Sequence, residues 1–261
     1  DLDHGVREGR PATFRAPAAD APQIHRLELE LATGERVLAT NHLDLAVYPR
    51  RVEPPAGGLT VWAADEDLRD RLQGLGYRIV ASSHEADALV AQALDEMLRA
   101  EVRGGARLVL LADQPMDLQP LFPHWQAVRV VRRAGTMWQG DWASSFSWLR
   151  RQGPFARLPG GPLIDHAFDR VIPRHVIAGC STWDFQARVH AGMVVGWVHK
   201  PAALIVEREY GRGRMVATTF RLLDDGPGVD PTATALLDGL LELAVADPRD
   251  AGRMPAEARP G

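Results

Sequence analysis

The pattern of apolar residues from 94 to 113 predicts one half of a βαβ unit. Its first part is typical of one helix face, because apolar residues recur there at three- and four-residue spacing: Leu94, Met97, Leu98 and Val102. Gly104 and Gly105 then end the helical pattern, and residues 108–112 are all apolar. A strand that is apolar on both faces belongs inside a parallel sheet that helices cover on each side.

Short apolar runs and helical patterns continue to alternate from residue 59 to residue 246, which predicts an α/β fold with a mostly parallel sheet. Residues 85–102 leave two alternatives open, a strand at 86–91 or one longer helix. The turn residues 210–213 predict a hairpin between the last two strands. Further strands are expected at 59–63, 77–81, 127–131, 189–198, 202–207 and 215–220.

Two more helices are expected, and each has an acidic residue at its start. The first spans residues 65–75, with Asp65 or Asp67 at its positive end. The second spans residues 231–245, with Asp230 as its N-cap.

The first fifty residues carry a different pattern. Leucine and glutamate alternate over residues 27–31, which is typical of a strand with one face in water. A turn at 33–35 and strands beginning at 37 and spanning 43–47 are expected to follow. Two or three antiparallel strands do not make a two-layer core by themselves. The segment therefore predicts the closing strands of a β-sandwich whose other strands lie upstream.

The chain is thus expected to divide into four parts. A partial β-sandwich comes first, a linker dense in proline and glycine follows, an α/β domain forms most of the chain, and a flexible tail ends it. Their expected boundaries are residues 1–50, 51–58, 59–246 and 247–261.

Composition narrows the class of partners. The net charge of -4 argues against nucleic acid, because no basic stripe is present to bind phosphates. No run of eighteen apolar residues occurs, which argues against a membrane-spanning helix. The single cysteine, Cys180, allows no internal disulfide, so the cytoplasm is the default compartment. Export stays open because the sequence starts at Asp1 and not at a methionine.

The residues that could carry chemistry are few. An α/β sheet holds its ligand beyond the carboxyl ends of its strands, and after the strand at 108–112 this position holds Asp113. No nucleophile elbow surrounds it. Cys180 would need a neighbouring cation or helix start to lower its pKa, and the nearby His175 and His190 have no geometry fixed by the sequence. The histidines show no zinc-ligand spacing, so we predict no catalytic residue, no metal and no cofactor.

A cluster of tryptophans is the strongest candidate for a binding surface. Trp138 and Trp142, with Gln139 and Asp141 between them, offer flat apolar faces beside hydrogen-bonding groups. Such a surface suits a sugar ring or a neighbouring domain. The alternative is that the rings fill the core or cover the sheet. Trp148, in the helix-like segment SFSWLRR, is expected to be less exposed than these two.

Two parts of the chain resemble known domains. Residues 25–49, with Gly34, Ala39 and Asn41, resemble the end of the immunoglobulin-like β-sandwich of glycoside hydrolase family 2 proteins. The remainder resembles the class I glutamine amidotransferase-like domain that closes many bacterial glycosidases. The matching stretches are LDEMLRAEVRGGARLVLL (94–111), EREYGRGRMVATTFRL (207–222) and DPTATALLDGLLELA (230–244).

The resemblance implies a flavodoxin-like fold and a role in a β-galactosidase-like protein. The catalytic cysteine of amidotransferases, with its His and Glu, is missing, so the resemblance transfers no catalytic residue. It implies a non-catalytic accessory region that packs against an upstream catalytic domain of the same chain, with carbohydrate or a second copy of the chain as further partners left open. Two alternatives are an amidotransferase-like enzyme that uses Cys180 and a carbohydrate-binding module that uses Trp138 and Trp142.

Overall fold

The computed structural model describes residue 13 and residues 15–50, 58–123, 125–133, 146–195, 200–224 and 230–246. The chain divides into two compact units, residues 1–50 and residues 51–261. None of the described helices is long and apolar enough to cross a membrane.

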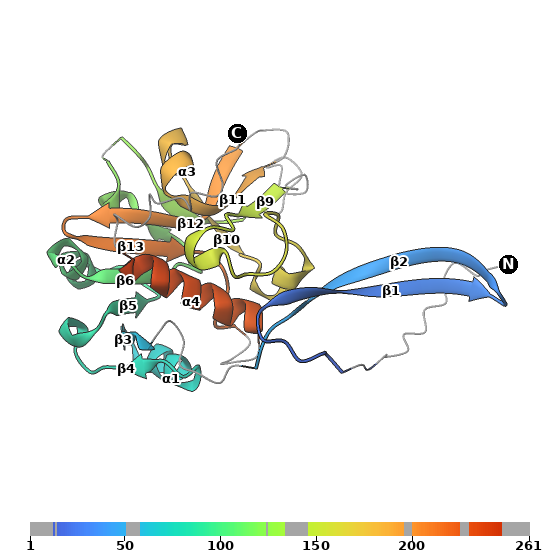
Figure 1. Cartoon of the computed structure of the whole chain (residues 1–261). Coiled ribbons are helices and arrows are strands. Elements are labelled where there is room, and N and C mark those ends of the chain that lie inside the picture. Colours follow the sequence, from blue (N-terminus) through green and yellow to red (C-terminus); the bar gives the residue numbers. More distant parts are fainter. Residues whose placement is uncertain are drawn as a thin grey trace, which may run out of the picture. The chain divides into compact units, whose positions relative to one another are not determined.

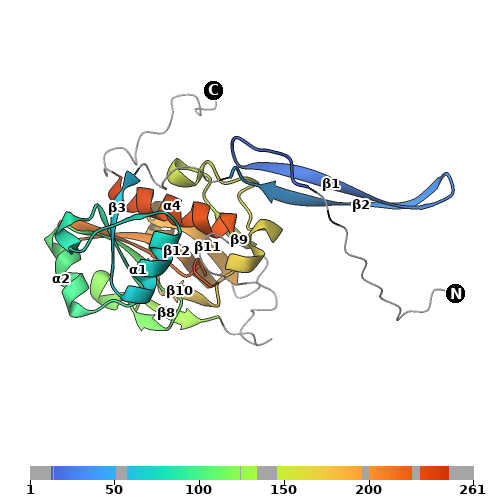
Figure 2. The same cartoon turned by 90° about the horizontal axis from the view of Figure 1, so that it is seen from below.

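The first unit contains a long β-hairpin. Strand β1 (Gln23–Thr33) pairs antiparallel with β2 (Arg36–Val47), and the two form a ribbon that Figures 1 and 2 show from two sides. Gly34 makes the turn with a positive φ of 57°. The prediction of a separate strand at 43–47 was wrong, because that segment continues β2 without a break. Asn41 lies within the ladder opposite Leu29 and does not end it.

The two faces of this ribbon differ in polarity. The pairing places Leu27 opposite Leu43 on one face and Arg26 opposite Asp44 on the other. The second pair forms a bidentate salt bridge, with an Arg26 Nε to Asp44 Oδ1 distance of 2.8 Å. Two strands form a single layer, so the ribbon cannot bury its own apolar face. The described residues of the first unit form no strand besides β1 and β2.

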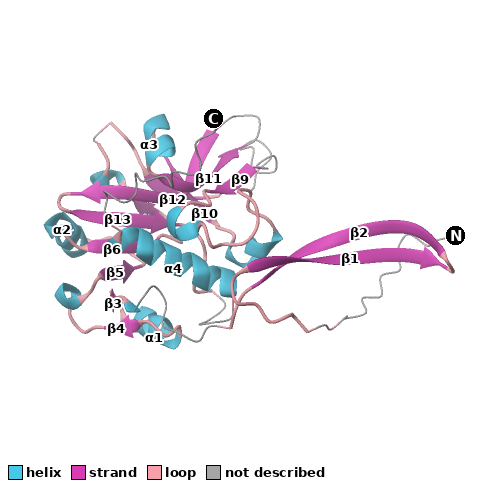
Figure 3. Ribbon diagram, in the orientation of Figure 1, coloured by secondary structure: helices cyan, strands magenta, loops and turns pink. Residues whose placement is uncertain are grey.

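The second unit is built on one mixed sheet of eleven described strands (Figure 3). Its main path runs β4-β3-β5-β6-β13-β12-β10-β8-β7, and β11 pairs with both β12 and β9. The strands are β3 (Thr60–Ala63), β4 (Arg78–Ile79), β5 (Ala88–Ala91), β6 (Arg107–Leu111), β7 (Met116–Asp117), β8 (Arg129–Arg132), β9 (Phe146–Leu149), β10 (His175–Ala178), β11 (Val189–Val195), β12 (Lys200–Tyr210) and β13 (Gly213–Thr218).

The sheet combines a parallel half with an antiparallel half. Strands β4, β3, β5, β6 and β13 run parallel to one another, as expected for βαβ units. From β13 onward every pair in the described part of the sheet is antiparallel. The expectation of a mostly parallel sheet was therefore wrong for this second half. The physical reason is clearest at β12 and β13, which only Gly211 and Arg212 separate, because so short a turn allows antiparallel pairing alone.

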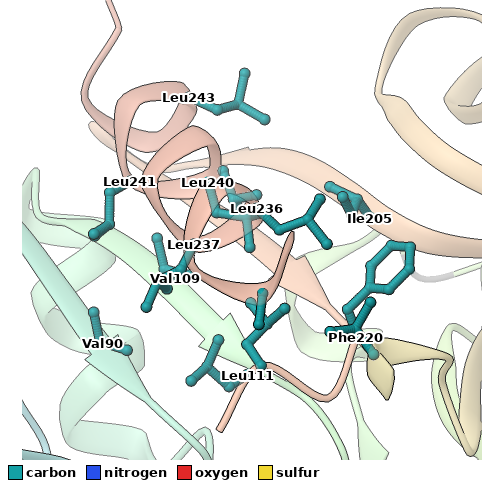
Figure 4. Close-up of a cluster of buried hydrophobic side chains, with 14 of the residues drawn as sticks. Val90, Val109, Leu111, Ile205, Phe220, Leu236, Leu237, Leu240, Leu241 and Leu243 are labelled. Carbon is teal, nitrogen blue, oxygen red and sulfur yellow. The ribbon is translucent and has the colours of Figure 1, made fainter. Parts of the chain in front are cut away.

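Helices cover both faces of the sheet. The helices are α1 (Glu66–Gly74), α2 (Glu96–Gly104), α3 (Thr182–Ala187) and α4 (Pro231–Val245), and 3₁₀ turns span Ser83–Glu85, Gln119–Leu121, Gly153–Phe155 and His166–Val171. Along β6, Val109 and Leu111 pack with α1 and α4, whereas Leu108 and Leu110 pack with α2. Figure 4 shows the leucines of α4 gathered over Val109 and Leu111. The predicted strand with two apolar faces is confirmed.

The helix starts follow the sequence signals. Asp65 and Asp230 cap α1 and α4 by accepting backbone N–H groups, as predicted. Asp95 does the same for α2, which starts at Glu96, so the alternative of one helix from residue 85 is excluded. The helix-like interpretation of the segment around Trp148 was wrong, because β9 includes this residue.

The turn between β12 and β13 lies against the end of α2. Gly211 has a φ of 63°, and a Cβ atom on Gly213 would lie 2.1 Å from the carbonyl oxygen of Val102. The backbone N–H of Arg212 donates to the carbonyl of Arg103 at 3.1 Å. Glycine is therefore needed at both positions, because the two backbones are in contact. Two of the stretches that carry the family resemblance, 94–111 and 207–222, meet at this contact.

Candidate functional site

A cavity of about 160 Å³ lies at the carboxyl edge of the parallel half of the sheet. Gln92 follows β5 directly, Asp113 lies two residues beyond β6, and Phe220 lies two residues beyond β13. These strand ends share one edge because the three strands are parallel. This is the edge at which α/β proteins hold ligands, and Asp113 is the residue expected there.

The charged side chains around this cavity are largely bonded to the protein itself. Arg71 of α1 donates to the carbonyl of Leu223 at 2.8 Å and forms an ion pair with Asp67 at 2.9 Å. Arg221 donates to the carboxylate of Asp224 at 2.9 Å and to two backbone carbonyls. Arg71 therefore joins α1 to the segment after β13, Arg221 joins that segment to residues 170–172, and each guanidinium makes at least two hydrogen bonds within the protein.

Two polar side chains at the cavity remain without such bonds. Asp113 and Gln92 form no hydrogen bond or ion pair to the part of the chain that the structure describes. The described lining residues include no thiol, imidazole or hydroxyl side chain. Asp113 is thus the only carboxylate of the described lining that is not paired with an arginine. Glycoside hydrolysis requires two cooperating carboxyl groups, and this cavity offers one.

Cys180 lies at a turn from strand to helix, the position that a nucleophile elbow takes. It follows β10 and Gly179 and precedes α3, whose N-cap is Ser181. Burial raises the pKa of the Cys180 thiol to about 12, and the charge of Asp184 adds to this effect. The thiol is therefore protonated at neutral pH, which is the reverse of what nucleophilic catalysis needs. The described structure gives it no contact with a histidine.

His190 belongs to a charged network in which Arg214 is buried and His190 and Glu207 are half-buried. Its Nε2 atom lies 2.9 Å from Oε2 of Glu207, whose Oε1 lies 3.5 Å from Nε of Arg214. Burial acts to raise the pKa of Glu207, but the hydrogen bond from His190 and the charge of Arg214 outweigh it, so this pKa is lowered. Arg214 also donates to the carbonyls of Leu243 and Ala246 at the end of α4. The network joins three strands to one helix and has a structural role.

The predicted tryptophan site cannot be placed on this framework. Trp138, Gln139, Asp141 and Trp142 lie outside the described residues. Trp148 is half-buried, stacks under the guanidinium of Arg150, and packs on Gly192 of β11. Among the described residues, no three histidine, cysteine, aspartate or glutamate side chains gather as metal ligands would.

Two other tryptophans are strongly exposed, and neither was predicted as a site residue. Trp125 is 81% exposed and Trp183 is 79% exposed. Trp183 lies in the first turn of α3, a short helix that was not predicted. Its sequence signal is the capping box formed by Ser181 and Asp184, in which each residue bonds the backbone N–H of the other.

Comparison with known proteins adds a weak structural likeness. No family model matches the sequence, and no curated protein matches it. A solved crystal structure of beta-galactosidase from Bacillus circulans sp. alkalophilus is similar, with a TM-score of 0.37 and 12% sequence identity. The match covers 74% of this chain and 32% of that chain, so this chain spans about a third of the length of that protein.

Proposed function

We propose that this chain is the non-catalytic accessory region of a family 2 glycoside hydrolase of β-galactosidase type, and that it supports an upstream catalytic domain by packing. The observation that carries the non-catalytic half of the proposal is the chemistry at the carboxyl edge of the sheet. Two of the carboxylates there, Asp67 and Asp224, are paired with arginines. Asp113 has no second unpaired carboxylate among the described lining residues, so the two-carboxyl mechanism has no partner for it.

The state of Cys180 supports the same conclusion against the amidotransferase alternative. The pKa of an ordinary cysteine thiol is about 8.5. The pKa of Cys180 is about 12, and the thiolate fraction falls tenfold for each pH unit below the pKa, so less than one part in ten thousand is thiolate at neutral pH. No histidine braced by a carboxylate contacts it in the described part of the chain. His190, which is braced by Glu207, is used in the charged network that includes Arg214.

The hairpin of β1 and β2 supports the accessory role. One face carries Leu27 and Leu43, and Leu29 and Leu31 on the same face are 49% and 63% exposed. An isolated two-stranded hairpin is marginal in water, so a second layer is needed to bury this face. In the proposal, that layer comes from β-sandwich strands upstream of Asp1, as in the family that residues 25–49 resemble.

The first experiment reads the coding sequence upstream of Asp1. The expected result is a run of β-sandwich strands and a (βα)₈ pattern with two acidic residues at strand ends. An upstream sequence without a catalytic domain of this kind would refute the proposal. With the full protein in hand, deletion of residues 59–246 is expected to lower the thermal stability or change the assembly state while the pH profile of the remaining hydrolysis stays the same.

A second experiment tests the chain itself for catalysis. The 261-residue chain is incubated with a nitrophenyl β-galactoside and, separately, with L-glutamine, and Cys180→Ala serves as the matched variant. We expect no release of nitrophenol or ammonia above the level of the blank. Ammonia release that disappears in Cys180→Ala would establish the amidotransferase alternative instead.

A further inference from the structure

Two exposed tryptophans lie on segments that are joined by a buried hydrogen bond. Trp125 precedes Gln126, and Trp183 precedes Asp184. Gln126 and Asp184 are 6% and 5% exposed, and Nε2 of Gln126 donates to Oδ2 of Asp184 at 2.6 Å. Segments that lie 58 positions apart in the sequence are therefore neighbours, and each presents one indole ring to solvent.

The backbones of the two segments are also in direct contact. A Cβ atom on Gly179, just before Cys180, would lie 2.4 Å from the carbonyl oxygen of Ala127. Gly179 also has a φ of 92°, which favours glycine. This contact and the Gln126–Asp184 hydrogen bond fix the two tryptophan-bearing segments relative to each other. A rigid support of this kind lowers the conformational entropy that the protein itself loses when a ligand binds.

Asp184 is the anchor of this junction. Its Oδ2 atom accepts hydrogen bonds from the Ser181 backbone N–H at 2.9 Å and from the Ser181 hydroxyl at 2.7 Å, in addition to the one from Gln126. Burial acts to raise the pKa of Asp184, but these hydrogen bonds and the charge of Arg208 outweigh it and lower the pKa. The carboxylate is therefore charged at neutral pH and holds the start of α3 in place.

One acceptor at the junction is left unused. Oε1 of Gln126 is buried and has no hydrogen-bond partner in the described part of the chain. A buried carbonyl without a partner is unfavourable by about 1–3 kcal/mol, and such groups are uncommon in folded proteins. Less than 1 Å² of this atom is exposed, so a sugar hydroxyl bonds to it only if the Gln126 side chain turns outward.

We infer that Trp125 and Trp183 form a carbohydrate-binding surface, on which pyranose rings stack. The ring C–H bonds of a sugar carry partial positive charge and meet the negative face of an indole, while its hydroxyl groups bond to polar neighbours. The surroundings offer hydrogen-bonding groups, because Thr182 and Gln186 of α3 are exposed, beside the small exposed residues Ala127 and Ala187. The inference rests on the proposed function only for the choice of galactosides as the first ligands.

The described surface argues against a protein partner at this place. The large apolar side chains that are exposed on the second unit are Met97, Trp125, Leu163 and Trp183, among the residues that the structure describes. Protein interfaces bury a contiguous area of several hundred Å² on each side, with an apolar centre. Two indoles with polar neighbours provide the area of one or two sugar rings.

The test measures sugar binding by the whole chain and by three single-site variants. The ligands are lactose, a soluble β-1,4-galactan and, as sugars of other classes, a soluble xylan and a soluble β-glucan. Isothermal titration and retardation in polysaccharide-containing gels report the binding. Trp125→Ala and Trp183→Ala test the surface, and Met97→Ala is the matched control because Met97 is an exposed apolar residue on another helix. Far-ultraviolet circular dichroism verifies that each variant is folded.

We expect binding of at least one polysaccharide, and each tryptophan variant is expected to weaken it about tenfold or more, which corresponds to about 1.4 kcal/mol. Met97→Ala is expected to bind like the unaltered chain. At about 10 mM of sugar units, even a site with a Kd of about 1 mM is nearly saturated. A folded chain that binds none of these sugars at that concentration would overturn the inference. Sugar binding by both tryptophan variants that equals the binding by the unaltered chain would overturn it as well. So would a dimer of the unaltered chain that either tryptophan substitution dissociates, because the two rings would then lie in a protein interface. None of these results bears on the accessory role, which the upstream sequence tests separately.

Discussion

Replacement of Arg214 by methionine is the perturbation for which the structure makes the sharpest prediction. Arg214 is 1% exposed, and its guanidinium serves two purposes. It lies 3.5 Å from the carboxylate of Glu207, too far for a good hydrogen bond but close enough for charge pairing. It also donates to the carbonyls of Leu243 and Ala246 at 2.9 and 3.0 Å, where the last turn of α4 lacks intrahelical partners.

The expected loss follows from the charge that the substitution leaves behind. Methionine fills a similar volume, so the change chiefly removes a buried cation from beside a half-buried carboxylate. Removing one partner of a buried ion pair typically destabilises a protein by about 3–5 kcal/mol. Glu207 keeps the hydrogen bond to His190 at 2.9 Å, which places the expectation at the lower end of that range. For a domain of this size, about 3 kcal/mol corresponds to a fall in Tm of roughly 6–12 °C.

Thermal unfolding and urea unfolding, followed by circular dichroism at pH 7.5, measure this loss. Arg129→Met on β8 is the matched control, because Arg129 is exposed, and it is expected to leave the Tm unchanged within about 1–2 °C. The decisive comparison is the double variant Arg214→Met/Glu207→Gln. It should be more stable than Arg214→Met alone, because the second substitution removes the uncompensated charge. A double variant that is less stable than Arg214→Met would refute this account of the network.

Three further predictions concern other parts of the chain. Gly213→Ala places a methyl group 2.1 Å from the carbonyl oxygen of Val102 and is expected to destabilise the fold by about 1–3 kcal/mol in urea unfolding. Its control is Gly104→Ala, which has no atom near its Cβ position and is expected to be neutral or slightly stabilising. Equal effects of the two substitutions on stability would contradict the contact. The rate at which Cys180 reacts with an alkylating reagent in the folded chain should still be rising at pH 10, since its pKa is about 12, and a plateau below pH 9 would show a different environment. The pKa of Glu207 is lowered in the folded state, so its contribution to stability is present above its unfolded pKa of about 4.3 and is lost as the pH falls through the folded pKa. Glu207→Gln should therefore flatten the acid side of the curve of stability against pH. An unchanged acid side in this variant would contradict the prediction.

The sequence pattern was sufficient where burial on two sides determines composition. Strand β6 reads as apolar at every position from Leu108 to Leu111 because helices cover both faces of the sheet there. The rule that ligands lie beyond strand ends correctly placed Asp113 at the edge cavity. Strand direction in the second half of the sheet could not be read in the same way, since the apolar pattern of a strand is the same in both directions.

The elements that were missed are short and depend on tertiary contacts. Strand β10 has four residues and begins with a buried histidine, His175, so its pattern is weak. Helix α3 has six residues, and its signal was the capping box of Ser181 and Asp184 alone. The exposure of Trp125 could not be predicted, because a tryptophan is usually buried and only the packed structure shows which rings are left outside.

Two hairpin tips in the described part of the chain, at Gly34 and at Gly211–Gly213, differ in how much added chain they can accept. At Gly34, between β1 and β2, no atom lies within 4 Å of the Cβ position, so the first atoms of an inserted peptide tag displace nothing. At Gly213, the tip between β12 and β13 lies on the backbone of α2, and the turn forms part of the interior packing. A genetic insertion at residues 33–36 should therefore yield folded protein, whereas the same insertion at residues 210–213 should force α2 and the hairpin apart and abolish soluble expression.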